Sequence, residues 1–282
     1  MPAVSPHAAA TGSRIGLRTI ALTYLTVLLI APLALVFYRA FEHGFGTFWD
    51  AVTSPAALHA LWLTVIITAI VVPLNAVFGV LAALILVRRR VPGRSFVSAL
   101  IDLPLALSPV VVGLCIILVW GPDDWLGQYA SDAGVQVIFA LPGMILATIF
   151  VCLPFVVREV VPVLREVGTD QEEAASTLGA TGWQTFWRIT LPAIRWGVIY
   201  GVILTTARAL GEYGAVAVVS SRVSGDTETL TLFVKSEYDQ LGSDAQVGAY
   251  GASVVLLLLA VIVVVGMNLL NRKGGSRGNH GI

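Results

Sequence analysis

The stretch DQEEAASTLGATGWQTFWRITLP, residues 170–192, is a polar and amphipathic insertion between two long apolar runs, and the rest of the chain reads as its support. Asp170 and Glu173 have the spacing of a helix N-cap residue and its partner at the third helical position. This spacing predicts a short helix. Gly179 is expected to end it, since glycine is the usual residue just past a helix C-terminus.

The second half of the stretch repeats the pattern. Thr181 and Gln184 have the spacing of a capping box and predict a second short helix. Pro192 suits the first turn of the helix that follows. Two capped helices at the end of membrane-spanning helices would form a rigid knob, on which a separate protein that supplies energy could push.

The composition is that of an integral membrane protein. Of the 282 residues, 57% are apolar and 12% are charged, which leaves too little polar material to coat a soluble globule. The formal net charge is zero, so no bulk field favours nucleic acid. Cys115 and Cys152 lie inside apolar runs, and they predict neither a disulfide framework nor a metal site.

Six stretches are long and apolar enough to cross a bilayer, which takes about 20 residues as a helix. They predict an all-α membrane protein with six transmembrane helices. Five of them contain no charged residue, and the fifth in chain order is interrupted by Arg208 and Glu212. The stretches are residues 19–38, 60–87, 103–121, 135–157, about 195–221, and 245–271.

The basic residues predict the orientation, because cytoplasmic loops are enriched in lysine and arginine. If the N-terminus is cytoplasmic, thirteen of the seventeen basic residues lie inside, and so does the stretch 170–192. Both termini would then be cytoplasmic. The thirteen are Arg14, Arg18, Arg88, Arg89, Arg90, Arg94, Arg158, Arg165, Arg188, Arg195, Arg272, Lys273 and Arg277.

The same pattern divides the chain into three parts. Residues 1–13 are small and polar, and we expect them to form a disordered cytoplasmic N-terminus. Residues 14–271 form the transmembrane domain, with the polar loop at 165–192, and residues 272–282 form a basic cytoplasmic tail.

The fifth crossing carries an ionisable pair. Arg208 and Glu212, in ARALGEYGAV, are four residues apart and are expected on one face of that helix. Charged groups at this depth are costly unless they face protein or water, so they are candidates for the translocation path. Three interpretations stay open: a pair that only fixes packing, a gate, or direct contact with a passing anion. A catalytic role in an intramembrane enzyme is disfavoured, because no nucleophile sits beside a base.

The third crossing contains prolines in SALIDLPLALSPVVVG, residues 98–113. Prolines at this depth free backbone carbonyls, and helices broken in this way often line substrate paths. Ser108 and Pro109 are therefore further path candidates. The fifth crossing also carries Gly197 and Gly201 in a GxxxG pattern, which is compatible with core packing and with dimerisation.

The polar stretch resembles the EAA loop of ABC importer permeases, and every position of that pattern is matched. In that family the loop docks as a coupling helix into a groove on a cytoplasmic ATP-binding subunit. The resemblance assigns coupling to Glu173, Ala174, Ala175, Leu178, Gly179, Ile189, Leu191 and Pro192.

A wider resemblance, from about Leu58 to Leu232, is to the W-type permease of bacterial sulfate/thiosulfate ABC importers. It is carried by LTVIITAIVVPLNAVFGV, IDLPLALSPVVVGL, PFVVREVVPVL, GATGWQTFWRITLPAIRW and ARALGEYGAVAVVSS. Molybdate permeases are similar over RALGEYGA, so a homodimeric molybdate or tungstate importer is the alternative. The chain has Thr231 where the family usually has proline.

The resemblance implies a type I ABC importer permease in the bacterial inner membrane. Its implied partners are a second, T-type permease, two copies of a cytoplasmic ATP-binding subunit, a periplasmic sulfate-binding protein and the lipid bilayer. The sequence contains no GxxxxGK[ST] loop, so ATP and magnesium would be held by the partner ATPase rather than by this chain. The permease itself is then no enzyme and carries no cofactor.

Overall fold

The computed structural model describes residues 6–89, 92–240 and 242–275, and within these ranges the ordered elements are all helices. The predicted all-α fold class is confirmed. The elements are α1 (Pro6–Phe41), α2 (Phe45–Val52), α3 (Pro55–Arg88), α4 (Arg94–Ala106), α5 (Pro109–Trp120), α6 (Trp125–Asp132), α7 (Leu141–Val167), α8 (Asp170–Thr177), α9 (Gly182–Thr185), the π-helical turn η1 (Phe186–Thr190), α10 (Leu191–Leu210), α11 (Val216–Val219), α12 (Leu230–Asp239) and α13 (Ser243–Gly275).

Five helices of the described chain are long and apolar enough to cross a membrane, and a bent pair makes up to six. The five lie at Arg18–Phe41, Pro55–Arg88, Leu141–Val167, Gly182–Leu210 and Ala245–Met267. The pair is α4 and α5, which meet at an angle of 113°. The six predicted crossings therefore all have counterparts, although three of them differ from the prediction in detail.

The third predicted crossing, residues 103–121, is not one helix. It breaks at Leu107 and Ser108, which have extended backbone, and a new helix begins at Pro109. Proline has no N–H for the preceding turn and pushes the residue before it toward extended conformations, so the break falls where the sequence places Ser-Pro.

The fourth and fifth crossings begin and end elsewhere than predicted. The fourth starts at Leu141 rather than at residue 135, with proline in its first turn. The fifth starts at Gly182 and ends at Leu210, so residues 211–221 lie outside it. The glycines at 211 and 214 interrupt the helix there.

Helices α3, α7 and α10 form the centre of the molecule and meet around one valine. A Cβ added at Gly79 of α3 would lie 2.6 Å from Val156 Cβ of α7, and one added at Gly201 of α10 would lie 2.8 Å from Val156 Cα. A Cβ on Gly197 would likewise lie 2.8 Å from the carbonyl oxygen of Glu159. The GxxxG ridge of α10 thus packs within the subunit, against the backbone of α7.

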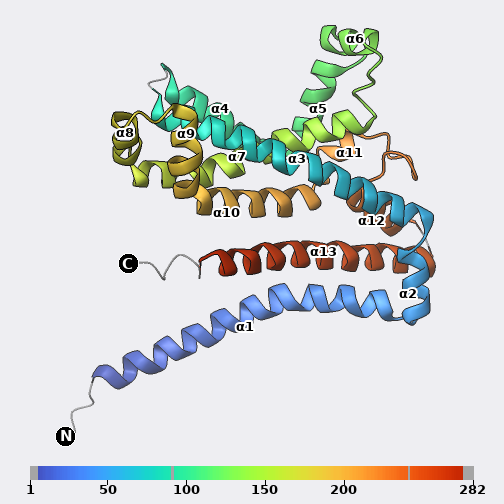
Figure 1. Ribbon diagram of the computed structural model, residues 1–282. Coiled ribbons are helices and arrows are strands. Elements are labelled where there is room, and N and C mark those ends of the chain that lie inside the picture. The colour runs from blue at the N-terminus through green and yellow to red at the C-terminus, as the bar shows by residue number, and fades with distance from the viewer. Residues whose placement is uncertain (1–5, 90–91, 241, 276–282) are drawn as a thin grey trace, which may run out of the picture.

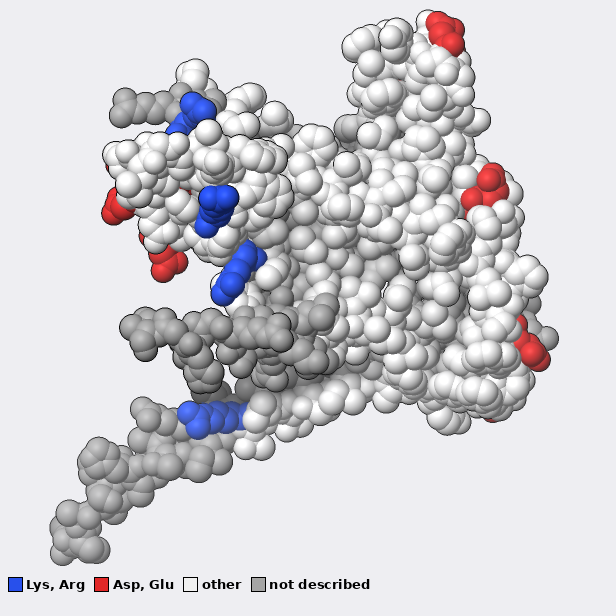
Figure 2. All heavy atoms as spheres, in the orientation of Figure 1, with Lys and Arg blue, Asp and Glu red and all other residues white. Residues whose placement is uncertain are grey.

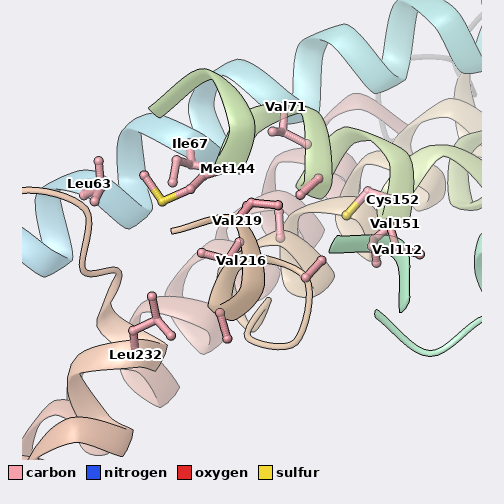
Figure 3. Packing of buried hydrophobic residues seen from close by; sticks show 14 residues of the cluster. Leu63, Ile67, Val71, Val112, Met144, Val151, Cys152, Val216, Val219 and Leu232 are labelled. Carbon is pink, nitrogen blue, oxygen red and sulfur yellow. The ribbon is translucent and has the colours of Figure 1, made fainter. Parts of the chain in front are cut away.

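A hydrophobic cluster extends this centre toward the break between α4 and α5. Figure 3 shows side chains of α3 and α7 enclosing the short helix α11, with Val112 of α5 and Leu232 of α12 at the sides. Met144, Ala147 and Cys152 of α7 are fully buried here. The apolar cluster therefore fixes where α11, and the chain that leads into it, can lie.

Helices α1 and α13 lie side by side at one edge of the molecule, joined to the centre through α2 and α12 (Figure 1). The start of α1 and the end of α13 lie at the same end of the molecule as α8 and α9. Helix α1 begins at Pro6, so the described part of the 1–13 segment is helical, which differs from the disorder expected there. Of the basic tail at 272–282, residues 276–282 lie outside the described residues.

Basic and acidic side chains are distributed unequally between the two ends of the molecule. On the face drawn in Figure 2, lysine and arginine lie at the end that carries α8 and α9, together with acidic residues, whereas the opposite end shows acidic residues only. This division agrees with the asymmetry of basic residues in the sequence.

The close approach of α10 to α7 yields a test. Gly201→Val should destabilise the protein by about 1–3 kcal/mol, because the added carbons meet the α7 backbone rather than a flexible side chain. The midpoint of thermal unfolding in detergent should fall by several degrees. Gly266→Val in α13 is the matched control, since its Cβ would meet nothing within 4 Å; equal midpoints for the two variants would contradict the packing described.

Candidate functional site

Helix α8 forms the first half of the knob, and its cap differs from the prediction. The N-cap residue is Thr169 rather than Asp170, which lies in the first turn. The Thr169 hydroxyl donates to a carboxylate oxygen of Glu173 at 2.7 Å, and the Glu173 N–H donates to the Thr169 carbonyl at 2.9 Å. Asp170 instead joins Glu172 and Glu173 in an acidic first turn, which the helix dipole stabilises.

The turn that ends α8 is as predicted. Gly179 has φ +84°, and its N–H donates to the Ser176 carbonyl at 3.0 Å. The Ala180 N–H donates to the Ala175 carbonyl, also at 3.0 Å. These two bonds make a Schellman motif, in which the residue at position 179 must adopt a left-handed conformation.

The coupling residues of α8 divide into a buried side and an exposed side. Ala175 is buried, whereas Glu173 and Ala174 are exposed, and the Leu178 side chain is 88% exposed. Helix α8 thus presents acidic side chains at its start and an exposed apolar side chain at its end.

The second half of the knob begins with the predicted capping box but does not form a separate helix. The Thr181 N–H donates to the Gln184 side chain at 2.9 Å, and the Gln184 N–H donates back to the Thr181 hydroxyl at 3.4 Å. Helix α9 then continues through η1 into α10 as one span, Gly182–Leu210. The predicted short second helix is thus the first turn of the fifth crossing.

The last three residues of the coupling pattern lie at this junction. Ile189 is in the π-helical turn, and Leu191 and Pro192 open α10. Proline cannot donate a hydrogen bond to the turn before it, and the wider turn lies directly before the proline. Because the chain is helical throughout, a displacement of α9 is carried into α10.

A clamp that the sequence analysis missed ties α8 to the helices behind it. An Arg88 guanidinium nitrogen at the end of α3 donates to the Gly168 carbonyl at 2.6 Å, and a second donates to the Leu164 carbonyl at 3.2 Å. The Arg88 Nε lies 3.0 Å from a carboxylate oxygen of Glu172, whose other oxygen accepts the Thr190 hydroxyl at 2.8 Å. Four segments (α3, the end of α7, α8 and η1) therefore meet at one ion pair.

The clamp has no sequence signature. Arg88 and Glu172 are 84 residues apart, and Arg88 is the first of three successive arginines, which reads only as a basic inner loop. Glu172 directly precedes the coupling pattern. The arrangement becomes visible when α3 and α8 are placed together in space.

The ionisable pair is formed, although not on one helix face as predicted. Helix α10 ends at Leu210, so Glu212 lies beyond the helix, yet its carboxylate is 2.5 Å from an Arg208 guanidinium nitrogen. The Glu212 side chain is 1% exposed and that of Arg208 is 30% exposed. The other Glu212 oxygen accepts the Ala215 N–H at 2.8 Å, which holds the loop that leads into α11.

Thr231, the residue that departs from the family pattern, also touches this loop. Its hydroxyl donates to the Glu212 carbonyl at 2.7 Å from the start of α12. A proline in the first turn of a helix would be tolerated there, but it would not supply this bond. The backbone of Glu212 is therefore tied to α12, and its side chain to α10 and α11.

The break between α4 and α5 packs on the same loop. A Cβ on Gly214 would lie 2.9 Å from Pro109 Cβ, and one on Gly113 would lie 2.8 Å from the Ala215 carbonyl oxygen. Ser108 is exposed, and its side chain does not cap α5. The structure thus brings Pro109 to the segment that contains Glu212, whereas the coupling residues lie at the other end of α10.

The pair can be tested by stability. Arg208→Ala should destabilise the protein by about 3–5 kcal/mol, because it leaves a buried carboxylate without its partner. In the double variant Arg208→Ala, Glu212→Gln the charge is gone and the amide oxygen can still accept the Ala215 N–H. The thermal midpoint of the double variant should therefore lie above that of the single variant; the reverse order would show that the pair is not mutually neutralising.

The clamp can be tested by hydrogen exchange. Glu172→Gln removes the charge that faces Arg88, so the amides of α8 should exchange about tenfold faster, as expected for the loss of roughly 1.5 kcal/mol of charged hydrogen bonding. Asp170→Asn, in the same turn and exposed, is the matched control. Equal protection of α8 in both variants would argue against the clamp.

The sequence matches a known family and close relatives. Residues 75–274 match the family of binding-protein-dependent transport system inner membrane components. The chain is 51% identical over 256 residues, covering 91% of this chain and 92% of the relative, to the sulfate transport system permease protein CysW of Synechocystis sp.. It is 45% identical over 240 residues to that of Escherichia coli K12, with coverages of 84% and 80%. It is 35% identical over 257 residues to the CysT permease of Synechocystis sp., with coverages of 90% and 88%.

The fold matches solved transporters. With a TM-score of 0.78 and 18% identity, the chain resembles a crystal structure of a bacterial ABC transporter involved in the import of the acidic polysaccharide alginate, over 94% of this chain and 96% of that chain. The bacterial alginate transporter in complex with its alginate pentasaccharide-bound periplasmic protein gives a TM-score of 0.76 at 18% identity, over 96% and 98%. At this identity the likeness concerns the fold, and it agrees with the importer-permease architecture predicted above. The chain therefore belongs to the binding-protein-dependent transport system inner membrane components and, within them, to the CysW-type permeases.

Proposed function

We propose that this chain is a permease subunit of an ABC importer that carries sulfate or thiosulfate across the bacterial inner membrane. The observation that carries the proposal is the 51% identity to a sulfate transport permease over nine-tenths of both chains. The likeness extends through α8 and through the loop that contains Glu212, which are the two parts of the fold with a candidate role.

The knob is the proposed coupling element. Glu173, Ala174 and Leu178 point their exposed side chains away from the body of the protein, and they would dock into a groove of a cytoplasmic ATP-binding subunit. Hydrolysis of ATP, with its magnesium, takes place in that partner. The permease contributes the path and the lever and is not itself catalytic.

The lever is α9, η1 and α10 together. ATP binding would draw two ATP-binding subunits together and displace α8 and α9. The clamp at Arg88 passes the displacement to α3, and the continuous span passes it to α10. At the far end of α10 the Arg208–Glu212 pair would shift against α11 and α5, which makes it the proposed gate, with Pro109 and Ser108 beside it.

The remaining partners follow from the relatives. A CysT-type permease, 35% identical to this chain, is the proposed second half of a heterodimer. A periplasmic sulfate-binding protein would dock at the end opposite α8, in the manner of the alginate transporter with its periplasmic protein. The exposed apolar side chains of α5, among them Leu114 and Leu118, are available to the second permease or to the bilayer.

The proposed topology places α8 and both termini in the cytoplasm. It is supported by the basic residues at the α8 end and by the start of α1 and the end of α13 at that same end. The protein would then be a multi-pass inner-membrane protein with an acidic outer face, and it is not expected to bind nucleic acid.

The experiment is uptake of labelled anion by a bacterial strain that lacks its own sulfate and molybdate permeases. This chain, expressed with a T-type permease, an ATP-binding subunit and a sulfate-binding protein, should restore uptake of sulfate. Unlabelled thiosulfate should compete and unlabelled molybdate should not. Uptake of molybdate alone, by a transporter that contains only this permease, would overturn the choice of anion and of partner.

The turn at Gly179 tests the coupling. Gly179→Leu should leave the protein inserted but lower sulfate uptake per ATP hydrolysed, because a side chain at φ +84° is strained by about 1–2 kcal/mol and the α8 turn would distort. Gly179→Asn should be milder, since asparagine tolerates this conformation. Gly182→Leu is the control, because its Cβ also meets nothing within 4 Å and its φ is not positive. Unchanged coupling in Gly179→Leu would contradict the assignment.

A further inference from the structure

A basic cavity lies between α4 and α7, at the end of the molecule that carries α8 (Figure 1). It has a volume of about 210 Å³ and is lined by Arg94, Arg158 and Arg165, with Asp102 as the acidic residue of the lining and Ser98 as a hydroxyl.

Two stripes of side chains build the cavity. Arg94, Ser98 and Asp102 are spaced by four residues and share one face of α4. Arg158 and Arg165 are seven residues apart on α7, which is two turns, or about 10 Å, along one face. The stripes face each other, because the Arg158 Nε donates to Asp102 at 2.9 Å.

The charges of the cavity do not cancel. Asp102 forms an ion pair with Arg158. Within the described residues, neither Arg94 nor Arg165 forms an ion pair. Arg94 also opens α4, where the helix dipole disfavours a cation and favours an anion. An anion in the cavity would therefore meet two guanidinium groups that have no carboxylate partner.

The cavity has an apolar floor and charged walls. Its floor includes Leu86 and Val157, which are buried. Its charged walls are open to solvent, since the side chains of Arg158 and Asp102 are 57% and 38% exposed, so an ion could enter and leave. The guanidinium groups supply planar donors to a tetrahedral oxyanion, and Ser98 adds a hydroxyl.

We propose that this cavity binds the transported oxyanion on the proposed cytoplasmic side, after it has crossed the membrane and before it is released. The inference rests on the proposed function and adds a site to it. The shared chemistry is a tetrahedral oxyanion centre, which both the sulfate dianion and the phosphodiester of an anionic lipid headgroup supply. Such a headgroup is therefore the competing source of the same contacts.

The test uses a cysteine at Ser98 in the assembled transporter, with Cys115→Ala and Cys152→Ala, in nanodiscs of phosphatidylcholine. Its modification by a negatively charged and by a positively charged methanethiosulfonate is compared. The rate with the anionic reagent divided by the rate with the cationic reagent should fall about fivefold in the double variant Arg94→Gln, Arg165→Gln. The reason is that two cations within roughly 10 Å no longer attract the anionic reagent. Ser95→Cys, the exposed neighbour on α4 that does not line the cavity, is the control and should change less.

Potassium sulfate, compared with potassium chloride at equal ionic strength, should slow modification of Ser98→Cys severalfold and leave Ser95→Cys unaffected. The protection should be lost in Arg94→Gln, Arg165→Gln. An unchanged rate ratio, or equal rates in sulfate and chloride, would overturn the proposal. Protection by phosphatidylglycerol in the nanodisc, with none by sulfate, would overturn it in favour of a lipid headgroup site.

Uptake of labelled sulfate by the transporter with the unaltered chain is measured in parallel. Uptake without protection at Ser98 would remove the cavity site and leave the proposed function standing. Absence of sulfate uptake would remove the proposed function, whatever the labelling shows.

Discussion

The contact on which the structure depends is the meeting of three helices at Val156. In lipid there is no hydrophobic drive for helices to associate, so close packing of backbones has to hold them together. Gly79 and Gly201 allow α3 and α10 to approach α7 to within contact of its backbone. The proposed coupling element and the proposed gate are attached to opposite ends of these helices: the knob and clamp at one end, and the loop with the ion pair at the other.

Polar contacts tie the central helices to the loops at both ends. The Arg88–Glu172 clamp joins the knob to α3 and to the carbonyls that end α7, and the π-helical turn joins it to α10. At the far end the Glu212 carboxylate is held by Arg208 of α10 and by the Ala215 N–H that leads into α11. Motion at one end therefore has a continuous route through packed helices and polar contacts to the other.

The sequence predicted those features that depend on a few neighbouring residues. The turn at Gly179 and the capping box at Thr181 were predicted because three or four neighbouring residues determine them. The N-cap of α8 was predicted at Asp170, one residue after its actual position at Thr169, because several acidic and hydroxyl residues compete at that helix start. The clamp between Arg88 and Glu172 could not be predicted, since it depends on how α3 and α8 pack. The end of α10 before Glu212 was missed because hydropathy does not register where glycines interrupt a helix.

The π-helical turn at Phe186–Thr190 has one further consequence. Such a turn holds one residue more than a regular helical turn, so it sets the azimuth of α9 relative to α10. If the same residues wound as ordinary α-helix instead, the two halves of the span would be turned relative to each other by about 100° about their common axis. The direction in which α8 and α9 face relative to α10 is thus encoded by five residues.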